Sequence, residues 1–584
     1  MSGTISPQYR LQKLLKKGLK HHQEGRLELA EACYRKILKV DPISSEARQL
    51  ARILEAKAGP GQGTIPSLHA TLSDDPNLLN NHAAAHLAEG KIQAAIDCLR
   101  RVAELRPESA QAHQHLGEAQ ERFGDLQAAA NSYQRAVALG PDSPDLHCHL
   151  ARVLFQSGAL RPAVELYQRA VVLDPKRYDI YNDLGLVLTK LGNYGAAIEA
   201  FRRSLRLNPH SAKTLASIGY HFECKGDLIS AAEAYRDAIK TEPGLFAAYV
   251  DLGFVLYGLG ELGEAADCFE RLRAQRPDSA EATANLGLIH LLQGNLPGGW
   301  AEYESRWKVG VGDDRRLTQR RWKGEPLNGE RILLYAEQGF GDTLQFVRYV
   351  PLVVARGGEV VLEVQPPLRR LLSVIEGVSQ VISRGDTLPE FTWQCPLLSL
   401  PLAFGTEMNT IPASVPYIHP DPTQVEAWRE RFQGNARRIG LVWSGNPSME
   451  RNRIRSLPLD LLVPLMKVPD TAFYSLQLGP ASEQVKHIPP GVRLIDLASE
   501  LNNFADTAAV VANLDLVISV DTSVAHLAGA MGKPVWILLN KGCDWRWFLE
   551  REDSPWYPSA RLFRQSTAGG WQEVVSHVER ALRH

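Results

Sequence analysis

The chain has 584 residues, of which 44% are hydrophobic and 22% charged, and its formal net charge is −1 at pH 7. This balance is ordinary for a globular protein and lacks the positive field that nucleic-acid binding needs, so we expect no nucleic-acid partner. Seven scattered cysteines without a CxxC pair indicate reduced thiols rather than disulfides or structural zinc. We find neither an uninterrupted apolar run of about 18 residues nor a signal-peptide core, so we expect a cytoplasmic protein without a membrane span.

Prolines recur with a spacing of 34 through the first half of the chain, at positions 107, 141, 175, 209, 243 and 277. Pro42 and Pro76 extend the series upstream with one shortened interval. A fixed period of this length predicts stacked pairs of antiparallel helices that form a superhelix with a concave surface. We place about eight such repeats, one of them degenerate, in residues 1–307.

The other positions of each unit also recur, and they resemble the tetratricopeptide repeat. In the unit that ends at Pro209, small residues stand at Gly185 and Ala197 and an aromatic residue at Phe201. In that family the small residues let the two helices approach, and the aromatic ring fills the gap between them. The stretch AGPGQGTIP, in the unit 43–75, is too rich in Gly and Pro for a second helix and predicts a break in the array. The last unit, with Pro297 and Gly298-Gly299, predicts a cap that docks onto the second half of the chain.

A column of polar residues runs through the first helices of the repeats. The simpler interpretation is a solvated helix face, because such residues are usually exposed. The alternative is a ladder in the concave groove that binds the backbone of an extended peptide, similar to the asparagine ladder of O-linked N-acetylglucosamine transferase. The acceptor-binding or partner-binding residues would then be His115, His149, Asp183, Ser217, Asp251 and Asn285.

The second half of the chain alternates predicted strands and helices. A charged, Gly-containing linker is expected over 308–330, and a Pro-rich boundary lies at about 412–422. Strands are expected at 331–336, 359–364, 379–383, about 437–443, 473–479, 492–498, 514–520 and 534–539, and a single amphipathic helix over 343–357. This alternation predicts two Rossmann-like domains, 331–420 and 421–584, with a cleft between them.

Asp521, Thr522 and Ser523 interrupt two apolar runs, after a predicted strand and before a short helix. In a parallel sheet such a turn lies at the carboxyl edge, and the N-terminus of the helix offers backbone N–H groups to an anion. We therefore predict a phosphate-binding turn. Earlier in the chain, Gly339 and Gly341 allow the backbone to approach a ligand closely, and Asp342 stands at a helix start, where the simpler interpretation is a helix cap.

Four segments in order, GFGDTLQFVRYVP, GLVWSGNP, FADTAAVVANLDLVISVDTSVAHLAGAMGKPVW and DWRWFLEREDSPWYPSARLFRQ, carry a second resemblance. They are similar to segments of bacterial tetratricopeptide proteins whose glycosyltransferase domain is akin to the lipopolysaccharide heptosyltransferases. The resemblance covers about residues 329–570. It implies a GT-B fold, with 331–420 on the acceptor side and 421–584 on the nucleotide-sugar side, and hence α + α/β for the whole chain. It also implies an inverting, metal-independent transfer from a nucleotide-sugar donor without a cofactor.

Carried over by position, the resemblance implies that Asp342 is the general base that takes a proton from the acceptor hydroxyl. His526, one helical turn after Thr522, either faces the same site or is a core histidine. Arg455 is the candidate cation for the leaving diphosphate, with Arg451 and Arg453 as alternatives, although each is also explained as a surface charge. The remaining residues implied to bind the donor are Gly339, Gly341, Ser444, Asn446, Asp521, Thr522 and Ser523.

Residues 543–558 concentrate Trp545, Trp547, Trp556 and Tyr557. Their rings could stack on a base or a sugar, but packing against the sheet is the more common role of such a segment. We therefore predict that this segment is structural.

The leading hypothesis is transfer of a sugar to a Ser/Thr hydroxyl of a protein that the repeat groove recognises. The domain combination is similar to O-linked N-acetylglucosamine transferases and to repeat-containing flagellin glycosyltransferases, which makes flagellin one acceptor that the resemblance implies. Two alternatives stay open: a scaffold with an inactive nucleotide-sugar-binding domain, and a transferase that acts on a cell-surface glycan. Homo-oligomerisation also stays open.

Overall fold

The computed structural model describes residues 7–23, 27–40, 75–310, 317–432, 434–447 and 452–584. The chain divides into two compact units, Met1–His221 and Phe222–His584. The break in the repeat array that we expected within 43–75 lies outside the described residues, apart from Asp75. None of the helices in the described ranges has the length and apolar character needed to cross a membrane.

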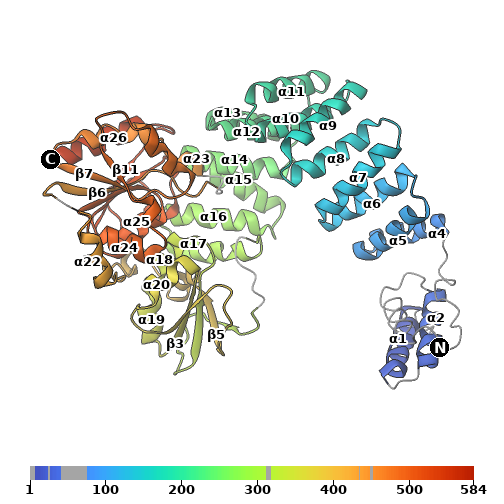
Figure 1. The fold of residues 1–584 in the computed structure, drawn as a ribbon, viewed down its shortest axis with the longest axis horizontal. Coiled ribbons are helices and arrows are strands. Elements are labelled where there is room, and N and C mark those ends of the chain that lie inside the picture. Colours follow the sequence, from blue (N-terminus) through green and yellow to red (C-terminus); the bar gives the residue numbers. More distant parts are fainter. Residues whose placement is uncertain (1–6, 24–26, 41–74, 311–316, 433, 448–451) are drawn as a thin grey trace. The chain divides into compact units, whose positions relative to one another are not determined.

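The first unit is built from pairs of antiparallel helices (Figure 1). Successive helices of 13 or 14 residues follow one another with short turns from α4 to α11. The helices are α1 (Pro7–Gln23), α2 (Leu27–Val40), α4 (Pro76–Ala88), α5 (Ile92–Leu105), α6 (Ala110–Phe123), α7 (Leu126–Leu139), α8 (Pro144–Gln156), α9 (Leu160–Leu173), α10 (Tyr178–Lys190) and α11 (Tyr194–Leu207). Helix α12 (Ala212–Lys225) spans the boundary between the two units.

Each pair closes where a small residue of the first helix faces an aromatic ring of the second. A Cβ atom added at Gly185 would lie 2.5 Å from the ring of Phe201, and one at Gly117 would lie 2.9 Å from Tyr133. Both rings are fully buried. In the intervening repeat the equivalent small residue is Ala151, so the spacing tolerates one methyl group there. The packing predicted from the periodic pattern is confirmed.

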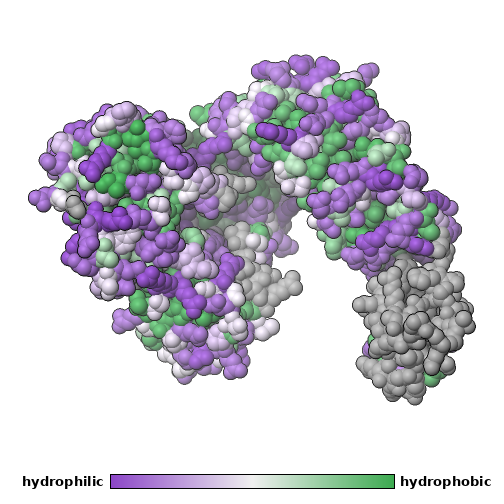
Figure 2. All heavy atoms as spheres, viewed as in Figure 1, coloured by the Kyte–Doolittle hydropathy of each residue, from purple (hydrophilic) through white to green (hydrophobic). Residues whose placement is uncertain are grey.

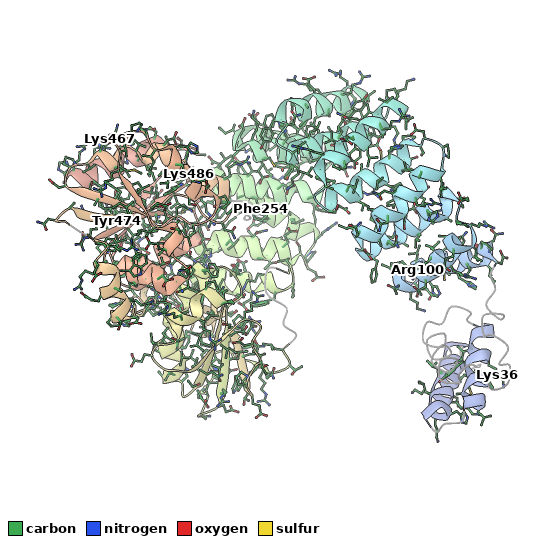
Figure 3. All side chains as sticks on the ribbon, viewed as in Figure 1. Lys36, Arg100, Phe254, Lys467, Tyr474 and Lys486 are labelled. Carbon is green, nitrogen blue, oxygen red and sulfur yellow. The ribbon has the colours of Figure 1, made fainter. Side chains whose placement is uncertain are left out.

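The second unit begins with further helices of the same kind: α13 (Leu228–Thr241), α14 (Phe246–Leu259), α15 (Leu262–Gln275), α16 (Ala280–Leu292) and α17 (Leu296–Tyr303). Phe254 of α14, labelled in Figure 3, meets Phe269 of α15 edge to face at 5.8 Å between ring centroids. In α17 the indole Nε1–H of Trp300 donates to the carbonyl oxygen of Thr406 at 3.0 Å. The last helix pair therefore docks onto the α/β part, as the sequence predicted.

The first sheet of the second unit has five parallel strands in the order β1-β5-β2-β3-β4. Strand β1 lies in the stretch 308–330 that we expected to be only a linker, so the sheet begins before residue 331. The strands are β1 (Arg320–Arg321), β2 (Arg331–Tyr335), β3 (Glu359–Val364), β4 (Val378–Ser383) and β5 (Trp393–Pro396).

The single helix predicted over 343–357 is wrong, because the structure breaks it into three pieces. Helix α18 (Phe340–Phe346) is followed by a short 3-10 turn (Val347–Tyr349) and by α19 (Val350–Ala355). Pro351 stands in the first turn of α19, where its missing N–H costs no intrahelical bond. The remaining short helices of this sheet are α20 (Arg369–Leu372) and α21 (Leu400–Ala403).

The second sheet has six parallel strands in the order β11-β10-β9-β6-β7-β8. The strand order reverses between β6 and β9, and open parallel sheets bind ligands outside the carboxyl ends of the strands at such a point. Its strands are β6 (Arg437–Val442), β7 (Thr471–Ser475), β8 (Leu494–Asp496), β9 (Leu516–Val520), β10 (Val535–Leu539) and β11 (Ala560–Arg564). Its helices are α22 (Pro422–Arg429), α23 (Asn452–Arg455), α24 (Phe504–Ala512), α25 (Ser523–Ala530) and α26 (Trp571–Arg583).

The core of the second sheet combines its strands with the C-terminal helix. Ile439 and Leu441 of β6 and Ile518 of β9 pack with Val574 and Val578 of α26, and all five side chains are at most 1% exposed. The central strands β2 and β9 are therefore buried, whereas the edge strands β4 and β8 are partly exposed.

On the face that Figure 2 shows, hydrophobic residues lie among hydrophilic ones.

Candidate active site

The turn after β2 carries the carboxylate that the sequence singled out. The backbone N–H of Gly339 donates to Asp342 Oδ2 at 2.7 Å, so Asp342 closes the first turn of α18. Its side chain is still 15% exposed. Asp342 thus caps the helix and also reaches the surface of the site, and the capping role does not use up its second carboxylate oxygen.

Gly341 lies against a histidine of the second sheet. A Cβ atom at this position would lie 2.7 Å from Cδ2 of His526, so the histidine ring occupies the space next to the backbone. Helix α18 of the first sheet accordingly packs on α25 of the second. Gly341 permits this contact between the two sheets, and its role in ligand approach stays a prediction.

The turn after β9 lies at the reversal point of the second sheet. Asp521, Thr522 and Ser523 are all half-buried and remain accessible. Thr522 is the residue that precedes α25, but its side chain makes no capping hydrogen bond; its hydroxyl instead pairs with the hydroxyl of Ser519 at 2.8 Å. The first backbone N–H groups of a helix have no partner within the helix, so this end is suited to an anion.

His526 is a buried residue that also borders the site. It is 5% exposed, its Nδ1 lies 2.9 Å from the hydroxyl of Tyr557, and its ring stacks on Trp547 with a centroid distance of 5.2 Å. Its Nε2 is 3.8 Å from Asp521 Oδ1. Burial, reinforced by the positive charge of Arg546, lowers the pKa of His526 to about 3. The ring is therefore neutral at physiological pH and supports the Asp521 turn by packing.

The loop after β6 contributes Ser444 and Asn446, but its backbone is already engaged. The N–H of Ser444 donates to Gln477 Oε1 at 2.8 Å, and the N–H of Gly445 donates to the hydroxyl of Ser456 at 3.3 Å. Ser444 is half-buried and Asn446 is exposed. The Ser444 hydroxyl is also engaged, with the Gly445 carbonyl oxygen and the Asn452 side chain, so donor binding by Ser444 and Asn446 stays a prediction.

Arg455, the candidate cation for the diphosphate, lies at the loop after β6. A Cβ atom added at Gly445 would lie 2.5 Å from Arg455 Nη2, so the guanidinium covers the loop backbone. Its positive charge opposes the rise in the pKa of Asp521, which places it near the turn after β9. Arg453 is exposed and Arg451 lies outside the described residues.

Asp544 and Arg546 also belong to this site, and sequence reasoning missed both. Arg546 Nη2 donates to Asp342 Oδ1, its Nη1 donates to Asp544 Oδ1 at 2.8 Å, and its Nε donates to Gln345 Oε1 at 2.6 Å. Both residues stand in the Trp-rich segment 543–558. The available signal was two oppositely charged residues that alternate with tryptophans in CDWRWF, a pattern that places charge inside an apolar segment.

The tryptophans of this segment are structural, as predicted. Trp545, Trp547 and Trp556 are at most 1% exposed and Tyr557 is fully buried. Trp545 meets Trp300 of the last helix pair edge to face at 5.0 Å. These buried rings therefore pack inside the protein and do not offer a surface to a base or a sugar, and Trp545 lies against Arg546.

Burial and charge act against each other on the three carboxylates. Burial raises the pKa of Asp342, and the Arg546 guanidinium opposes this rise. Burial, together with the negative charge of Asp544, raises the pKa of Asp521 to about 6. Burial also disfavours the ionised form of Asp544, but the charge of Arg546 and its hydrogen bonds to Asp544 lower the pKa overall. Such perturbed carboxylates in one place are typical of functional sites.

Comparison with known proteins agrees with this arrangement. Tetratricopeptide repeat models match residues 14–44, 80–144, 148–212 and 250–308. Residues 476–539, which contain the turn after β9, match the model of glycosyltransferase family 9 (heptosyltransferase). The repeats are tetratricopeptide repeats. The segment that matches glycosyltransferase family 9 lies in the second sheet and includes β8, β9 and β10.

A curated relative is Protein FlbA of Caulobacter vibrioides, 28% identical over 325 residues, or 50% of this chain and 54% of that protein. The chain thus spans about half the length of this relative. A tetratricopeptide repeat protein from Parabacteroides merdae covers 41% of the chain and 94% of its own, with 18% identity and a TM-score of 0.36. MamA from Desulfovibrio magneticus covers 30% and 98%, with 22% identity and a TM-score of 0.28.

The polar column of the tetratricopeptide repeats is more enclosed than a solvated face. Ser217 and Asn285 are buried, and the other four residues are half-buried. His149 stacks on Tyr133 with a centroid distance of 5.4 Å, and Asp183 accepts from Lys213 Nζ at 3.1 Å. Much of the polar capacity of the column is thus used within the array, and its binding of a peptide stays a prediction.

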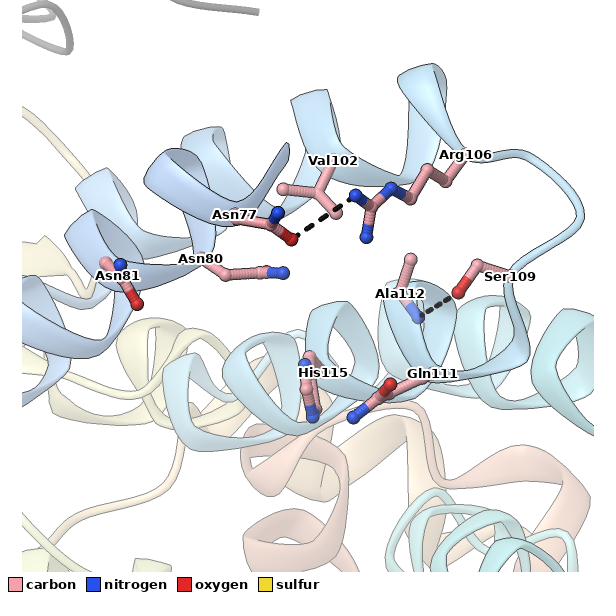
Figure 4. A pocket seen from close by; sticks show the side chains of 9 residues that line it. All are labelled: Asn77, Asn80, Asn81, Val102, Arg106, Ser109, Gln111, Ala112 and His115. Atoms are coloured by element: carbon pink, nitrogen blue, oxygen red, sulfur yellow. Dashed lines mark hydrogen bonds between the residues drawn. The ribbon is translucent and has the colours of Figure 1, made fainter. Parts of the chain in front are cut away.

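One residue of the column also lines a cavity of about 320 Å³ between α4, α5 and α6. The side chains around it are mostly polar, and several are amides (Figure 4). Arg106 Nη2 donates to Asn77 Oδ1 at 3.3 Å across one side. The lining residues with amide, guanidinium or imidazole groups are Asn77, Asn80, Asn81, Arg106, Gln111 and His115. This lining offers hydrogen bonds to a polar chain such as a peptide backbone.

No group of three or more His, Cys, Asp or Glu side chains with the geometry to hold a metal ion occurs in the ranges that the structure describes. The acids of the site are instead neighbours of Arg546. The described part of the site therefore contains arginines and a helix N-terminus as its positive partners for an anion.

Proposed function

We propose that this protein is an inverting glycosyltransferase that moves a sugar from a nucleotide donor to a Ser/Thr hydroxyl of a protein acceptor. The observation that carries the proposal is the meeting of two turns. Asp342 follows β2 of the first sheet, the Asp521–Ser523 turn follows β9 of the second, and α18 packs on α25 between them. The match of 476–539 to glycosyltransferase family 9 supports the same conclusion.

In this proposal the donor diphosphate lies at the N-terminus of α25, against Thr522, Ser523 and the side chains of the loop after β6. Arg455 supplies positive charge there, because its guanidinium covers that loop. A protonated Asp521 donates a hydrogen bond to phosphate, whereas an ionised Asp521 repels it. Helix N-terminus and arginine together stabilise the charge that develops on the leaving diphosphate without a metal ion.

The chemical step needs one carboxylate. Asp342 takes the proton of the acceptor hydroxyl as its oxygen bonds to the anomeric carbon, and the bond from that carbon to the diphosphate oxygen breaks. The electron pair of this bond leaves with the nucleoside diphosphate. A single displacement of this kind inverts the anomeric centre, and the ion pair with Arg546 opposes the rise that burial causes in the pKa of Asp342.

The acceptor is proposed to be a protein because tetratricopeptide repeats occupy the first half of the chain and continue into the unit that holds the site. The amide-lined cavity between α4, α5 and α6 offers polar contacts of the kind an extended peptide uses. Helices α14 to α17 lie in the same unit as the two sheets, so the last repeats share the framework of the site.

The test is thermal stabilisation of the full-length protein by UDP-, GDP-, ADP-, CMP- and dTDP-sugars, with and without EDTA. We expect one donor class to raise the melting temperature, because a ligand of the native state stabilises it. Asp521→Ala should lose this response while remaining folded. EDTA should leave it unchanged.

Turnover is then measured as release of nucleoside diphosphate with Ser/Thr-containing protein acceptors and with glycans. Asp342→Asn should lower kcat by about 10²–10⁴-fold and keep the stabilisation by donor. Asp237→Asn, on the exposed face of α13, is the matched control. A folded protein that responds to no donor would contradict the proposal and favour a scaffold role, and transfer to glycans alone would contradict the protein acceptor.

A further inference from the structure

Arg546 is the residue around which the candidate active site is built, although no comparison points to it. It is 6% exposed, and all three of its guanidinium nitrogens donate to acceptors within the site. The acceptors come from two places far apart in the sequence: Asp342 and Gln345 belong to α18, and Asp544 belongs to its own segment. One buried cation thus ties the first sheet to the segment after β10.

Two aromatic rings pack against the guanidinium of Arg546. Its guanidinium lies 4.3 Å from the ring centroid of Trp545 and 5.8 Å from that of Phe346. Trp545 in turn packs against Trp300 of α17. An arginine held between rings and three acceptors has little freedom to leave its place when a ligand binds.

The backbone before Arg546 is held by the tetratricopeptide helices. The hydroxyl of Tyr257 in α14 donates to the carbonyl oxygen of Cys543 at 2.8 Å, and this bond is buried. A Cβ atom added at Gly542 would lie 2.1 Å from the carbonyl oxygen of Tyr257. Segment 541–547 therefore takes its course from direct contact with the second-last helix pair.

We propose that Arg546 is a positioning residue, which orients Asp342 for proton transfer and favours its carboxylate form through their ion pair, and that helices α14 to α17 hold it in place. The inference rests on the proposed function, in which Asp342 is the base. Arg546 binds Asp342 Oδ1 while the Gly339 N–H binds Oδ2, so both oxygens are fixed and each keeps a lone pair for the acceptor hydroxyl. The last repeats thereby become part of the catalytic framework.

Other charges near Asp342 do not replace this role. The carboxylate of Asp544, next to Arg546, is negative and favours protonation of Asp342, and so does Glu337, two residues after β2, when it is ionised. Tyr303 of α17 and His526 of α25 are neutral at physiological pH, since burial raises the pKa of Tyr303 to about 12 and lowers that of His526 to about 3. Arg546 is thus the cation in contact with Asp342.

The first experiment compares Arg546→Met and Arg546→Lys with the wild type in the full-length protein, using the donor that stabilises it. With methionine, the acid limb of the kcat–pH profile should move up by about one pH unit or more, and kcat below the limb should fall about tenfold. The KM for donor should change little, and lysine should restore part of kcat. Arg551→Met, which removes an arginine whose ion pair is on the surface, is the matched control.

A raised donor KM with an unmoved acid limb would overturn the proposal and make Arg546 a ligand of the diphosphate. A second measurement does not depend on turnover: a double-mutant cycle of thermal unfolding with Arg546→Met and Asp342→Asn. The two substitutions should be coupled at pH 8, and the coupling should fade as pH falls and Asp342 is protonated. Absence of coupling would overturn the proposal even in a protein without transferase activity, whereas coupling without donor binding would contradict only the proposed function.

Discussion

The repeats and the candidate active site each contain a glycine that lets another part of the chain approach closely, but the two partners lie at very different distances along the chain. In the repeats, Gly185 admits the ring of Phe201 from the next helix of the same pair. In the site, Gly542 admits the backbone of Tyr257, and the hydrogen bond that accompanies it joins residues 286 positions apart. A contact within a repeat recurs with the period of the sequence, and its residues can differ from one repeat to the next. A contact between distant segments occurs once, so its two sides must fit each other without such variation.

The sharpest way to test this difference is Gly542→Ala. The added methyl group would meet backbone atoms of Tyr257 and Gly258, at 2.1 and 2.6 Å, and backbone cannot turn aside as a side chain can. We expect a loss of about 3 kcal/mol or more in the free energy of unfolding of the second unit. All 11 tryptophans stand at position 300 or later, so tryptophan fluorescence in a denaturant titration reports this unit alone.

A useful control for this experiment is Gly263→Ala in α15, where an added Cβ meets nothing within 4 Å. It should be neutral or slightly stabilising, because alanine favours a helix more than glycine does. If Gly542→Ala were as mild as this control, the close contact between α14 and the segment before Arg546 would be wrong, and so would the role assigned to the last repeats.

Local features were the predictable part of the fold. The proline period, the small residues and Phe201 were sufficient to place the helix pairs, because every contact that closes a pair lies within one repeat. The strands β2, β3, β6, β9 and β10 were readable as apolar runs for the same reason. The helix over 343–357 failed because its apolar pattern continues through Pro351, and the pattern alone does not register the break.

We expect the turn after β9 to make the stability of the protein depend on pH. The pKa of Asp521 in the folded protein is about 6, above its usual value of 3.8, so the folded state binds the proton more tightly than the unfolded state does. This contribution to stability is complete below about pH 4 and is lost as pH rises through 6. Asp521→Asn, which cannot ionise, should therefore gain stability relative to the wild type with rising pH, by about 2–3 kcal/mol at pH 8.

The measurement is the difference in unfolding free energy between the two proteins at pH 4 and pH 8, again from tryptophan fluorescence. Comparing the variant with the wild type cancels the opposite effect of His526, whose lowered pKa stabilises the fold increasingly as pH rises from about 3 to 6.5. Asp544, Arg455 and Arg546, the other charged groups near Asp521, are present in both proteins. A difference that does not grow with pH would show that Asp521 is ionised at low pH.

The site was only half predictable from the sequence. Asp342 and the Asp521–Ser523 turn were found because each follows a buried strand and begins a helix, which is a local arrangement. Arg546 was not found, because its partners Asp342 and Gln345 lie 204 and 201 positions away and its own neighbours are tryptophans that indicate packing. The relation between the two sheets decides which charges meet, and no local pattern contains that relation.

The smallest expected effect is that of Gly185→Ala in the first unit, which tests the contact within a repeat. The added methyl group would lie 2.5 Å from the edge of the Phe201 ring, but Ala151 already stands at the equivalent position against Tyr167, so the ring can shift. We expect a loss of only about 1–2 kcal/mol in the free energy of unfolding.

The control is Gly195→Ala, near the start of α11, where an added Cβ meets nothing within 4 Å; it should be neutral to slightly stabilising. Circular dichroism at 222 nm follows both, because the first unit has no tryptophan. A loss as large as that of Gly542→Ala would mean that the repeats are as rigidly fitted as the site, and that their periodic sequence reflects strict rather than adaptable packing.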